Sequence, residues 1–222
     1  MGKRRNGYPR RVTNRAQARP RPKPAEGQSW YRIENKAGAD TTEVYLYDEI
    51  GFWGVPASEF VDELRAITTS KIDLHVNSPG GEIFDGIAIY NAILGHKATV
   101  TAYVVGIAAS AASWVIQAAE RVLINRHAEM MIHDGQGICV GDSRDMHQMA
   151  DMLDRSSDNI ASIYAERAGG TVTAWRDRMR EETWYSAQEA VDAGLADELT
   201  GSDPQARPAR RDEANSWDLW VF

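Results

Sequence analysis

The apolar positions of this chain form two kinds of pattern. In several short segments, apolar and polar residues alternate or form brief β-branched runs, and turn-forming residues such as the Pro-Gly-Gly at 79–81 follow. Such segments are typical of strands. The predicted strands are 43–47, 71–76, 100–105, 121–124 and 130–132.

Longer segments carry apolar residues at every third or fourth position, which predicts helices. A short Ala-rich helix should follow Ser110, and another should lie around Val172–Met179. The Gly-Gly at 169–170 is a stop signal for the longest helix, and Ser186 with Glu189 has the spacing of a capping box. The remaining predicted helices are 56–67, 82–94, 142–167 and 186–193.

This alternation of strands and helices predicts an α/β fold with mainly parallel pairing and right-handed crossovers. The 222 residues suffice for one domain with a sizeable core. We expect that domain at 29–200, ordered from near Trp30, between a basic Pro-rich arm at 1–28 and a flexible tail at 201–222. The tail ends in an apolar peptide, 217–222, which could dock on the body or a neighbour, or fray.

Charge is distributed unevenly along the chain. Residues 1–25 contain nine Lys or Arg and no acid, whereas the rest contains 16 basic and 32 acidic residues. The arm has few large aliphatic residues, so we expect it to be disordered. It could bind an acidic surface or nucleic acid, or stay solvated without a dedicated partner. The acidic body argues against nucleic-acid binding by the folded domain.

Composition also limits the classes of function. No apolar run reaches about 18 residues, so no transmembrane helix is expected, and the basic N-terminus lacks the apolar core of a secretory signal. The single cysteine, Cys139, rules out an internal disulfide and fits a reducing cytoplasm. No base is adjacent to it, which favours a small loop residue over a nucleophile. Metal-ligand spacings and phosphate loops are missing from the sequence, so we predict no metal or cofactor.

Three segments carry candidate chemistry. Ser110 stands where an apolar strand gives way to an Ala-rich helix, as an exposed nucleophile on a tight turn would. Gly80 and Gly81 form a pair whose amides can face a ligand, and His133 ends a short apolar strand. A nucleophile, a base and a donor pair are most of the parts of a serine hydrolase.

The same segments resemble the signature blocks of the ClpP family, the proteolytic subunit of Clp-type proteases. The blocks are Asn-Ser-Pro-Gly-Gly at 77–81, Gly-Ile-Ala-Ala-Ser at 106–110 and Met-Ile-His at 131–133, and the resemblance covers roughly 40–200. Two further blocks, at 84–91 and 182–187, look more like the phage and prophage branch, whose members often serve as head maturation proteases.

The resemblance implies a ClpP/crotonase-like fold of stacked βαβ units, in which the helix at 142–167 is a protruding handle that interlocks two rings. The pattern alone is equally compatible with a helix packed on its own sheet. The implied activity is a serine endopeptidase acting on polypeptides in a homo-oligomeric ring or double ring (heptamer or tetradecamer), in the bacterial cytoplasm or a phage prohead. An AAA+ unfoldase, or phage capsid and scaffold proteins, would be partners.

The resemblance also assigns roles to residues. Ser110 is the nucleophile that forms the acyl-enzyme, and His133 is the general base. The rival base, His127, lies six residues before the family's position. Backbone N–H groups of Gly81 and Ala111 form the oxyanion hole, and 135–140 pairs an extended substrate strand. The expected substrate-binding residues are Gly80, Gly135, Gln136 and Gly137.

The third triad member is less defined. Relatives place Asp four residues before the Ser-Ala pair that opens the last helix, and counting back from Ser186 reaches Glu182. A longer carboxylate can still accept a hydrogen bond from an imidazole N–H. Glu181 and Asp177 are alternatives, as is a merely solvent-facing Glu182. Two other functions stay open: a catalytically silent ring or assembly subunit, and a crotonase-type acyl-CoA enzyme, which would need no Ser–His pair.

Overall fold

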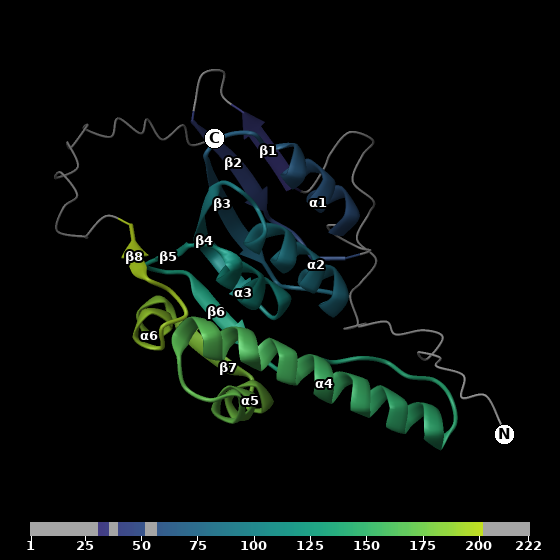
Figure 1. Cartoon of the computed structure of the whole chain (residues 1–222). Coiled ribbons are helices and arrows are strands. Elements are labelled where there is room, and N and C mark those ends of the chain that lie inside the picture. The colour runs from purple at the N-terminus through teal and green to yellow at the C-terminus, as the bar shows by residue number, and fades with distance from the viewer. Residues whose placement is uncertain (1–30, 36–39, 52–56, 202–222) are drawn as a thin grey trace, which may run out of the picture.

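The strands of the chain form one twisted sheet (Figure 1). The computed structural model describes residues 31–35, 40–51 and 57–201. The order of the main sheet is β1-β2-β3-β4-β5-β8, while β6 pairs with β4, and β7 with β6. The strands are β1 (Tyr31–Asn35), β2 (Thr41–Leu46), β3 (Lys71–Ser78), β4 (Thr99–Ala109), β5 (Arg121–Asn125), β6 (Glu129–Ile132), β7 (Thr183–Ser186) and β8 (Glu198–Thr200).

Parallel pairing dominates the sheet, and the predicted α/β class is confirmed. Strands β2, β3, β4, β5 and β8 pair in parallel, as do β4 and β6. Only β1–β2 and β6–β7 are antiparallel among the described strands. The helices are α1 (Ala57–Ala66), α2 (Ile83–Leu94), α3 (Ala111–Val115), η1 (Ile116–Ala118), α4 (Ser143–Ala168), α5 (Val172–Arg180) and α6 (Ala187–Asp192).

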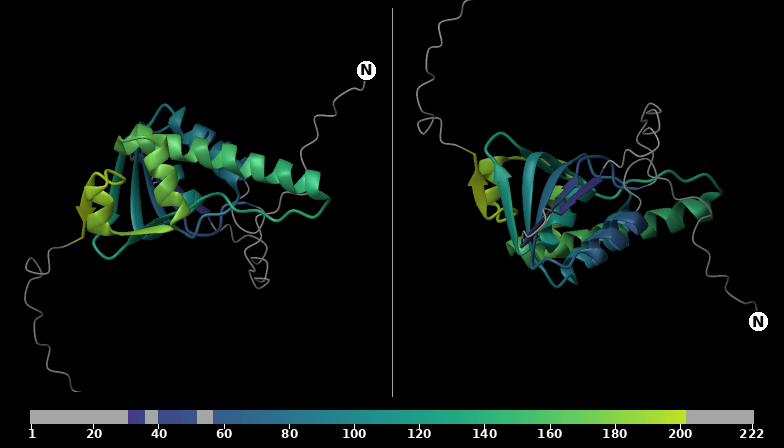
Figure 2. Two further views of the ribbon diagram at one scale, coloured as in Figure 1. Left: turned by 90° about the horizontal axis from the view of Figure 1, so that it is seen from below. Right: turned by 90° about the horizontal axis from the view of Figure 1, so that it is seen from above.

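The core lies between the sheet and the helices on one of its faces (Figures 1 and 2). Alternate residues of the central strands are completely buried there, for example Val44, Val76 and Val104. On the other face, the rings of Tyr45, His75 and Tyr103 stack with centroid distances of 4.8 and 5.1 Å. This difference between the faces explains the alternation from which these strands were predicted.

Strand β4 is longer than predicted and changes partner along its length. It was expected to end at Val105 but continues to Ala109, because its first part pairs with β5 and residues 107–109 pair with β6. Where β3 shifts register, the side chain of Asn77 accepts a hydrogen bond from the Ile107 N–H at 3.2 Å. The second partner carries the chain as a strand directly up to Ser110.

Helix α4 extends past the sheet, as the handle prediction required (Figures 1 and 2). A capping box of Asp142 and Asp145 begins it, and Gly169, with φ +78°, ends it. Its buried residues lie mostly in the C-terminal half, from Ser157 to Tyr164, whereas most of its first turns are exposed. Half of the helix is therefore anchored to the core.

The remaining predictions have mixed outcomes. The predicted arm at 1–28 and the peptide at 217–222 lie outside the described residues. Strands β1, β7 and β8 were not predicted, since they are short and become recognisable only through their pairing partners. The capping box of Ser186 and Glu189 at the start of α6 is confirmed. Within the described ranges, no helix has the length and apolar character needed to cross a membrane.

Candidate active site

Ser110 and His133 meet at the ends of two paired strands. Ser110 follows β4 and His133 follows β6, and the parallel register of these strands brings their carboxyl ends together. The Oγ of Ser110 lies 2.6 Å from Nε2 of His133. The two strongest candidates from the sequence are therefore in direct hydrogen-bond contact.

Ser110 has a strained backbone. Its φ of 50° and ψ of −124° lie in a region that non-glycine residues rarely occupy, with a cost of about 1–3 kcal/mol. The Ser110 N–H donates to the carbonyl of Met131 at 2.9 Å, and the hydroxyl of Ser113 donates to the Ser110 carbonyl at 2.6 Å. The turn is thus fixed on both sides, so the side chain projects from the end of the sheet as in a nucleophile elbow.

Ser113 belongs to a buried chain of hydrogen bonds. Its Oγ lies 2.7 Å from the hydroxyl of Tyr164 on α4, and both side chains are almost completely buried. A serine hydroxyl has a single hydrogen, which Ser113 gives to Ser110, so Tyr164 donates to Ser113. Burial raises the pKa of Tyr164, and its hydrogen bond to Ser113 lowers it by less, so the phenol stays a neutral donor.

The glycine pair lies against the serine turn. A Cβ on Gly80 would lie 2.6 Å from the Cβ of Ser110 and from the backbone of Ala109 and Ala111, and a Cβ on Gly81 would lie 1.8 Å from the carbonyl oxygen of Ile50. Their φ angles are +93° and +153°. Only glycine fits at either position.

Two backbone N–H groups near Ser110 are candidate oxyanion donors. Ile50 donates to the Gly80 carbonyl and accepts from the Glu82 N–H, each at 2.8 Å, so the N–H of Gly81 is not used in the pairing with Ile50. Ala111 is the first residue of α3, and the N–H groups of a first helical turn have no partner within their helix. An oxyanion-hole role for this pair stays a prediction.

His133 and Glu182 flank the same end of a strand pair. The last register pair of β6 and β7 is Ile132 with Thr183, so His133 and Glu182 are the next residues outward on each strand. The imidazole Nδ1 is buried and has no hydrogen-bond partner in the described part of the chain. Glu182 is exposed, has a φ of +51°, and accepts a long 3.4 Å hydrogen bond from the Trp184 indole. The carboxylate is close to His133 but is not bonded to it.

The charges around His133 distinguish the candidates for the third residue. Burial lowers the pKa of His133, and the carboxylates of Glu182 and Asp134 raise it by less, so the imidazole is neutral at neutral pH. Asp177 is instead paired with Arg180 at 3.0 Å. Glu181 is exposed in the turn after α5. Of the three carboxylates considered from the sequence, the electrostatics favour Glu182.

The two residues considered as rivals lie elsewhere. His127 is exposed in the turn between β5 and β6, at the opposite end of β6 from His133. Cys139 is half-buried in the irregular segment that follows the base. Neither takes part in the Ser110–His133 contact.

The segment after His133 runs between α2 and α4 as an irregular chain. The N–H of Gly135 donates to Ser157 of α4 at 2.9 Å, and Gly137 lies directly against Met149. Gln136 and Gly137 are exposed, and Val140 is 93% exposed. A substrate-binding role for Gly80, Gly135, Gln136 and Gly137 stays a prediction.

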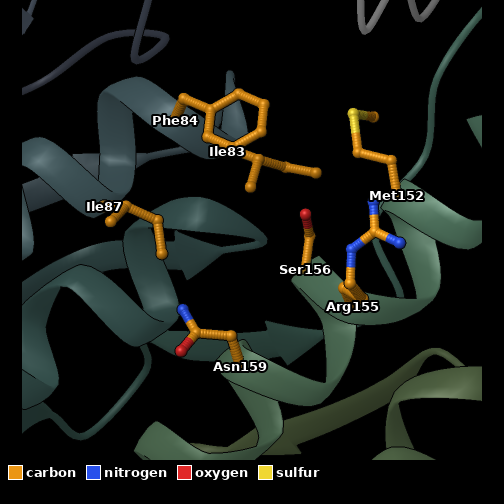
Figure 3. A pocket seen from close by; sticks show the side chains of 7 residues that line it. All are labelled: Ile83, Phe84, Ile87, Met152, Arg155, Ser156 and Asn159. Carbon is orange, nitrogen blue, oxygen red and sulfur yellow. The ribbon is translucent and has the colours of Figure 1, made fainter. Parts of the chain in front are cut away.

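A cleft opens beside this segment. It has a volume of about 250 Å³ and lies between Ile83, Phe84 and Ile87 of α2 and Met152 and Arg155 of α4 (Figure 3). Ile83 also borders Gly135, because a Cβ on that glycine would lie 2.8 Å from the Ile83 side chain. The cleft is therefore continuous with the segment that follows the base, and its walls are mainly apolar.

Comparison with known proteins agrees with this geometry. The family model for Clp protease matches residues 27–203. This chain belongs to the Clp protease family. It is 29% identical over 182 residues to the ATP-dependent Clp protease proteolytic subunit of Pleurastrum terricola, covering 76% of this chain and 93% of that protein.

Bacterial members of the Clp protease family are similar to a comparable degree. Proteolytic subunit 1 of Protochlamydia amoebophila is 31% identical over 179 residues, covering 77% of this chain and 85% of that protein. Proteolytic subunit 2 of Rhodococcus jostii is 31% identical over 141 residues, or 61% and 70% of the two chains. The protein is thus a ClpP-family serine endopeptidase, and the fold and family predicted from the sequence are confirmed.

One residue beside the Clp protease site escaped the sequence reasoning. Arg176 is 4% exposed and binds the carboxylate of Asp134, the residue after the base. A helix with basic residues at spaced positions normally points them to solvent. Asp154 and Asp158 lie one turn apart on α4, which could have indicated a partner cation. Nothing in the sequence, however, showed that this cation would come from α5.

Proposed function

We propose that this ClpP-family protein hydrolyses peptide bonds through Ser110 as nucleophile and His133 as general base. The observation that carries the proposal is the 2.6 Å contact between Ser110 Oγ and His133 Nε2, made by a serine in a strained backbone conformation. A neutral imidazole is needed to accept the serine proton, and the lowered pKa of His133 supports that state at neutral pH.

The reaction would proceed by two acyl-transfer steps. Ser110 Oγ attacks the scissile carbonyl carbon while its proton passes to Nε2 of His133. The carbonyl oxygen takes the developing negative charge between the N–H groups of Gly81 and Ala111. His133 then gives the proton to the leaving amine, and the C–N bond breaks to leave an ester on Ser110. Water, deprotonated by His133, hydrolyses the ester and restores the serine.

Glu182 would complete the triad after a side-chain rotation. When Nε2 accepts the serine proton, Nδ1 carries hydrogen, and a buried N–H without an acceptor is costly. Glu182 flanks the same end of the β6–β7 pair and is exposed, with only a long contact to Trp184. Rotation toward Nδ1 would fix the tautomer and stabilise the imidazolium formed in each step.

The substrate would lie along 135–140 as an extended strand, with one side chain in the cleft between α2 and α4. The apolar walls formed by Ile83, Ile87 and Met152 support a preference for an apolar side chain at that subsite. Backbone pairing outside the subsite would tolerate varied sequences.

We further propose a ring assembly that uses the exposed half of α4, and a role in phage or prophage head maturation. The assembly is supported by the first turns of α4, which extend past the sheet (Figure 1). The phage role rests on the sequence blocks at 84–91 and 182–187, with capsid or scaffold proteins as substrates in a prohead. A cytoplasmic ring served by an AAA+ unfoldase is the alternative setting. Native mass spectrometry of the purified chain tests the assembly, and a strict monomer would contradict it.

Fluorophosphonate labelling with intact-mass detection tests the catalytic assignment. Wild type should gain one adduct, and Ser110→Ala should gain none. His133→Ala should label at least about 100-fold more slowly, because the serine loses its base. The matched control is His127→Ala, which removes an exposed histidine at the other end of β6 and should label like wild type.

Two outcomes would overturn the assignment. An adduct that persists in Ser110→Ala would place the nucleophile elsewhere. An assembled ring that does not label would identify a catalytically silent subunit.

A further inference from the structure

Arg176 is a buried cation at the junction of three segments. It lies on α5, and its side chain is 5% exposed. Its Nε and Nη2 donate to the two carboxylate oxygens of Asp134 at 3.1 and 3.0 Å. From α4, Asp154 accepts through its side chain at 3.1 Å and its carbonyl at 3.0 Å, and Asp158 accepts from Nη1. Such a two-pronged contact fixes the orientation of a carboxylate.

The contact with Asp134 reaches the catalytic base through one peptide bond. Asp134 directly follows His133, and its N–H donates to the carbonyl of Met179 on α5 at 3.1 Å. Both the backbone and the side chain of the residue after the base are therefore attached to α5. Asp154 and Asp158 attach the same guanidinium to α4.

We propose that Arg176 is a positioning residue for His133: by holding Asp134 in a two-pronged contact, it keeps that carboxylate from pairing with the imidazole and leaves Nδ1 to Glu182. This inference rests on the proposed function. A carboxylate on the residue after the base would otherwise be a competitor for Nδ1, which is buried and has no partner in the described ranges.

The charges around His133 predict the direction in which its pKa should change when Arg176 is removed. Glu182, from the turn before β7, and Asp134, on the loop of the base, both favour a protonated His133. Arg176 on α5 is the cation opposite Asp134, with Asp154 and Asp158 of α4 behind it. Without the guanidinium, Asp134 is free to stabilise the imidazolium, so His133 should protonate at a higher pH. An opposite charge at contact distance shifts a pKa by about one unit or more.

The test is the pH dependence of fluorophosphonate labelling in the full chain. The labelling rate should fall as the pH is lowered and His133 becomes protonated, and we call this part of the pH profile the acid limb. Arg176→Gln should move its half-maximal pH up by about one unit, because the base is then neutral only at higher pH. Adding Asp134→Asn to that variant should return the limb to the wild-type position or below. The matched control is Arg180→Gln, which removes the same charge from the exposed side of α5 and should leave the limb in place.

A merely structural role for Arg176 predicts a different result. It would lower the plateau rate or the melting temperature without moving the acid limb, and Asp134→Asn would not reverse the loss. Either finding overturns the proposal. Should Arg176→Gln not fold, Arg176→Lys keeps the cation but not the two-pronged contact. It should then shift the limb up by a smaller amount, and an unshifted limb would contradict the idea.

Failure of the proposed function is distinguishable from failure of this inference. A wild-type protein that never labels refutes the catalytic assignment, whatever Arg176 does. In that case the pKa of His133 can be read by histidine ring NMR in the Ser110→Ala background, with His133→Gln to assign its signal among the five histidines. Arg176→Gln should again raise that pKa, and an unchanged pKa would refute the positioning role alone.

Discussion

The buried hydrogen bonds behind Ser110 predict a specific order of stability among three variants. Ser113→Ala removes the hydroxyl that donates to the Ser110 carbonyl at 2.6 Å and leaves the Tyr164 hydroxyl without its 2.7 Å partner. Because Tyr164 is 1% exposed, that donor cannot turn to solvent. Stranding a buried polar group costs about 1–3 kcal/mol.

Tyr164→Phe is the milder change. Ser113 keeps its hydrogen bond to Ser110 and loses only the one it accepts, which costs about 0.5–1.5 kcal/mol. The double variant Ser113→Ala/Tyr164→Phe has no stranded donor. It should therefore be at least as stable as Ser113→Ala alone, with a coupling of about 1 kcal/mol in its favour.

Thermal unfolding of all four proteins at one protein concentration measures this order. A difference of about 1 kcal/mol corresponds to roughly 2–4 °C for a domain of this size. Both single variants should also label more slowly with a fluorophosphonate, Ser113→Ala more so, because the strained turn at Ser110 loses its support. Strictly additive losses in the double variant would refute the reasoning, since they would mean that no donor is stranded.

Other variants test the donors and the base. Gly81→Ala should slow labelling at least about 100-fold, because its Cβ would overlap the Ile50 carbonyl at 1.8 Å and shift an oxyanion donor. Gly169→Ala, also at positive φ but with no atom within 4 Å of its Cβ, should cost about 1 kcal/mol of stability in urea unfolding and leave the rate unchanged. The acid limb of wild-type labelling should lie below pH of about 6.5, because burial lowers the pKa of His133. Glu182→Gln removes a charge that raises the pKa of His133, so the acid limb should move to still lower pH and the maximal labelling rate should fall. An acid limb that moves to higher pH would contradict the assignment of Glu182 as the third triad member.

The two central residues could be predicted because each ends a strand that the sequence makes obvious. Ser110 follows β4 and His133 follows β6, and parallel strands place their carboxyl ends at one edge of a sheet. The glycines were recognisable as a turn, and in the structure Gly80 lies against Ser110 while Gly81 lies against Ile50. Local pattern and one topological rule account for the strand ends, and the resemblance to the ClpP family selected His133 over His127.

The rest depends on pairing between distant segments, which a pattern does not encode. Strand β7 has four residues, and its register with β6 is what places Glu182 beside His133. Tyr164 lies in a helix predicted from apolar spacing alone, and its hydroxyl bonds to Ser113, 51 residues earlier in the chain. Arg176 is buried because carboxylates from two other segments converge on it. Each of these contacts joins residues far apart in the chain, and neither helix nor strand periodicity predicts such contacts.

The pairing of β6 with β7 makes the segment 133–182 a closed excursion of the chain. It leaves the sheet after Ile132 and returns to it at Thr183, directly opposite in the ladder. The exposed first turns of α4 begin ten residues after His133 and extend past the sheet. The β6–β7 pairing fixes the separation of the two ends of this segment, whatever the length of the chain between them. A change confined to the exposed first turns of α4 would therefore leave His133 and Glu182 at the same separation.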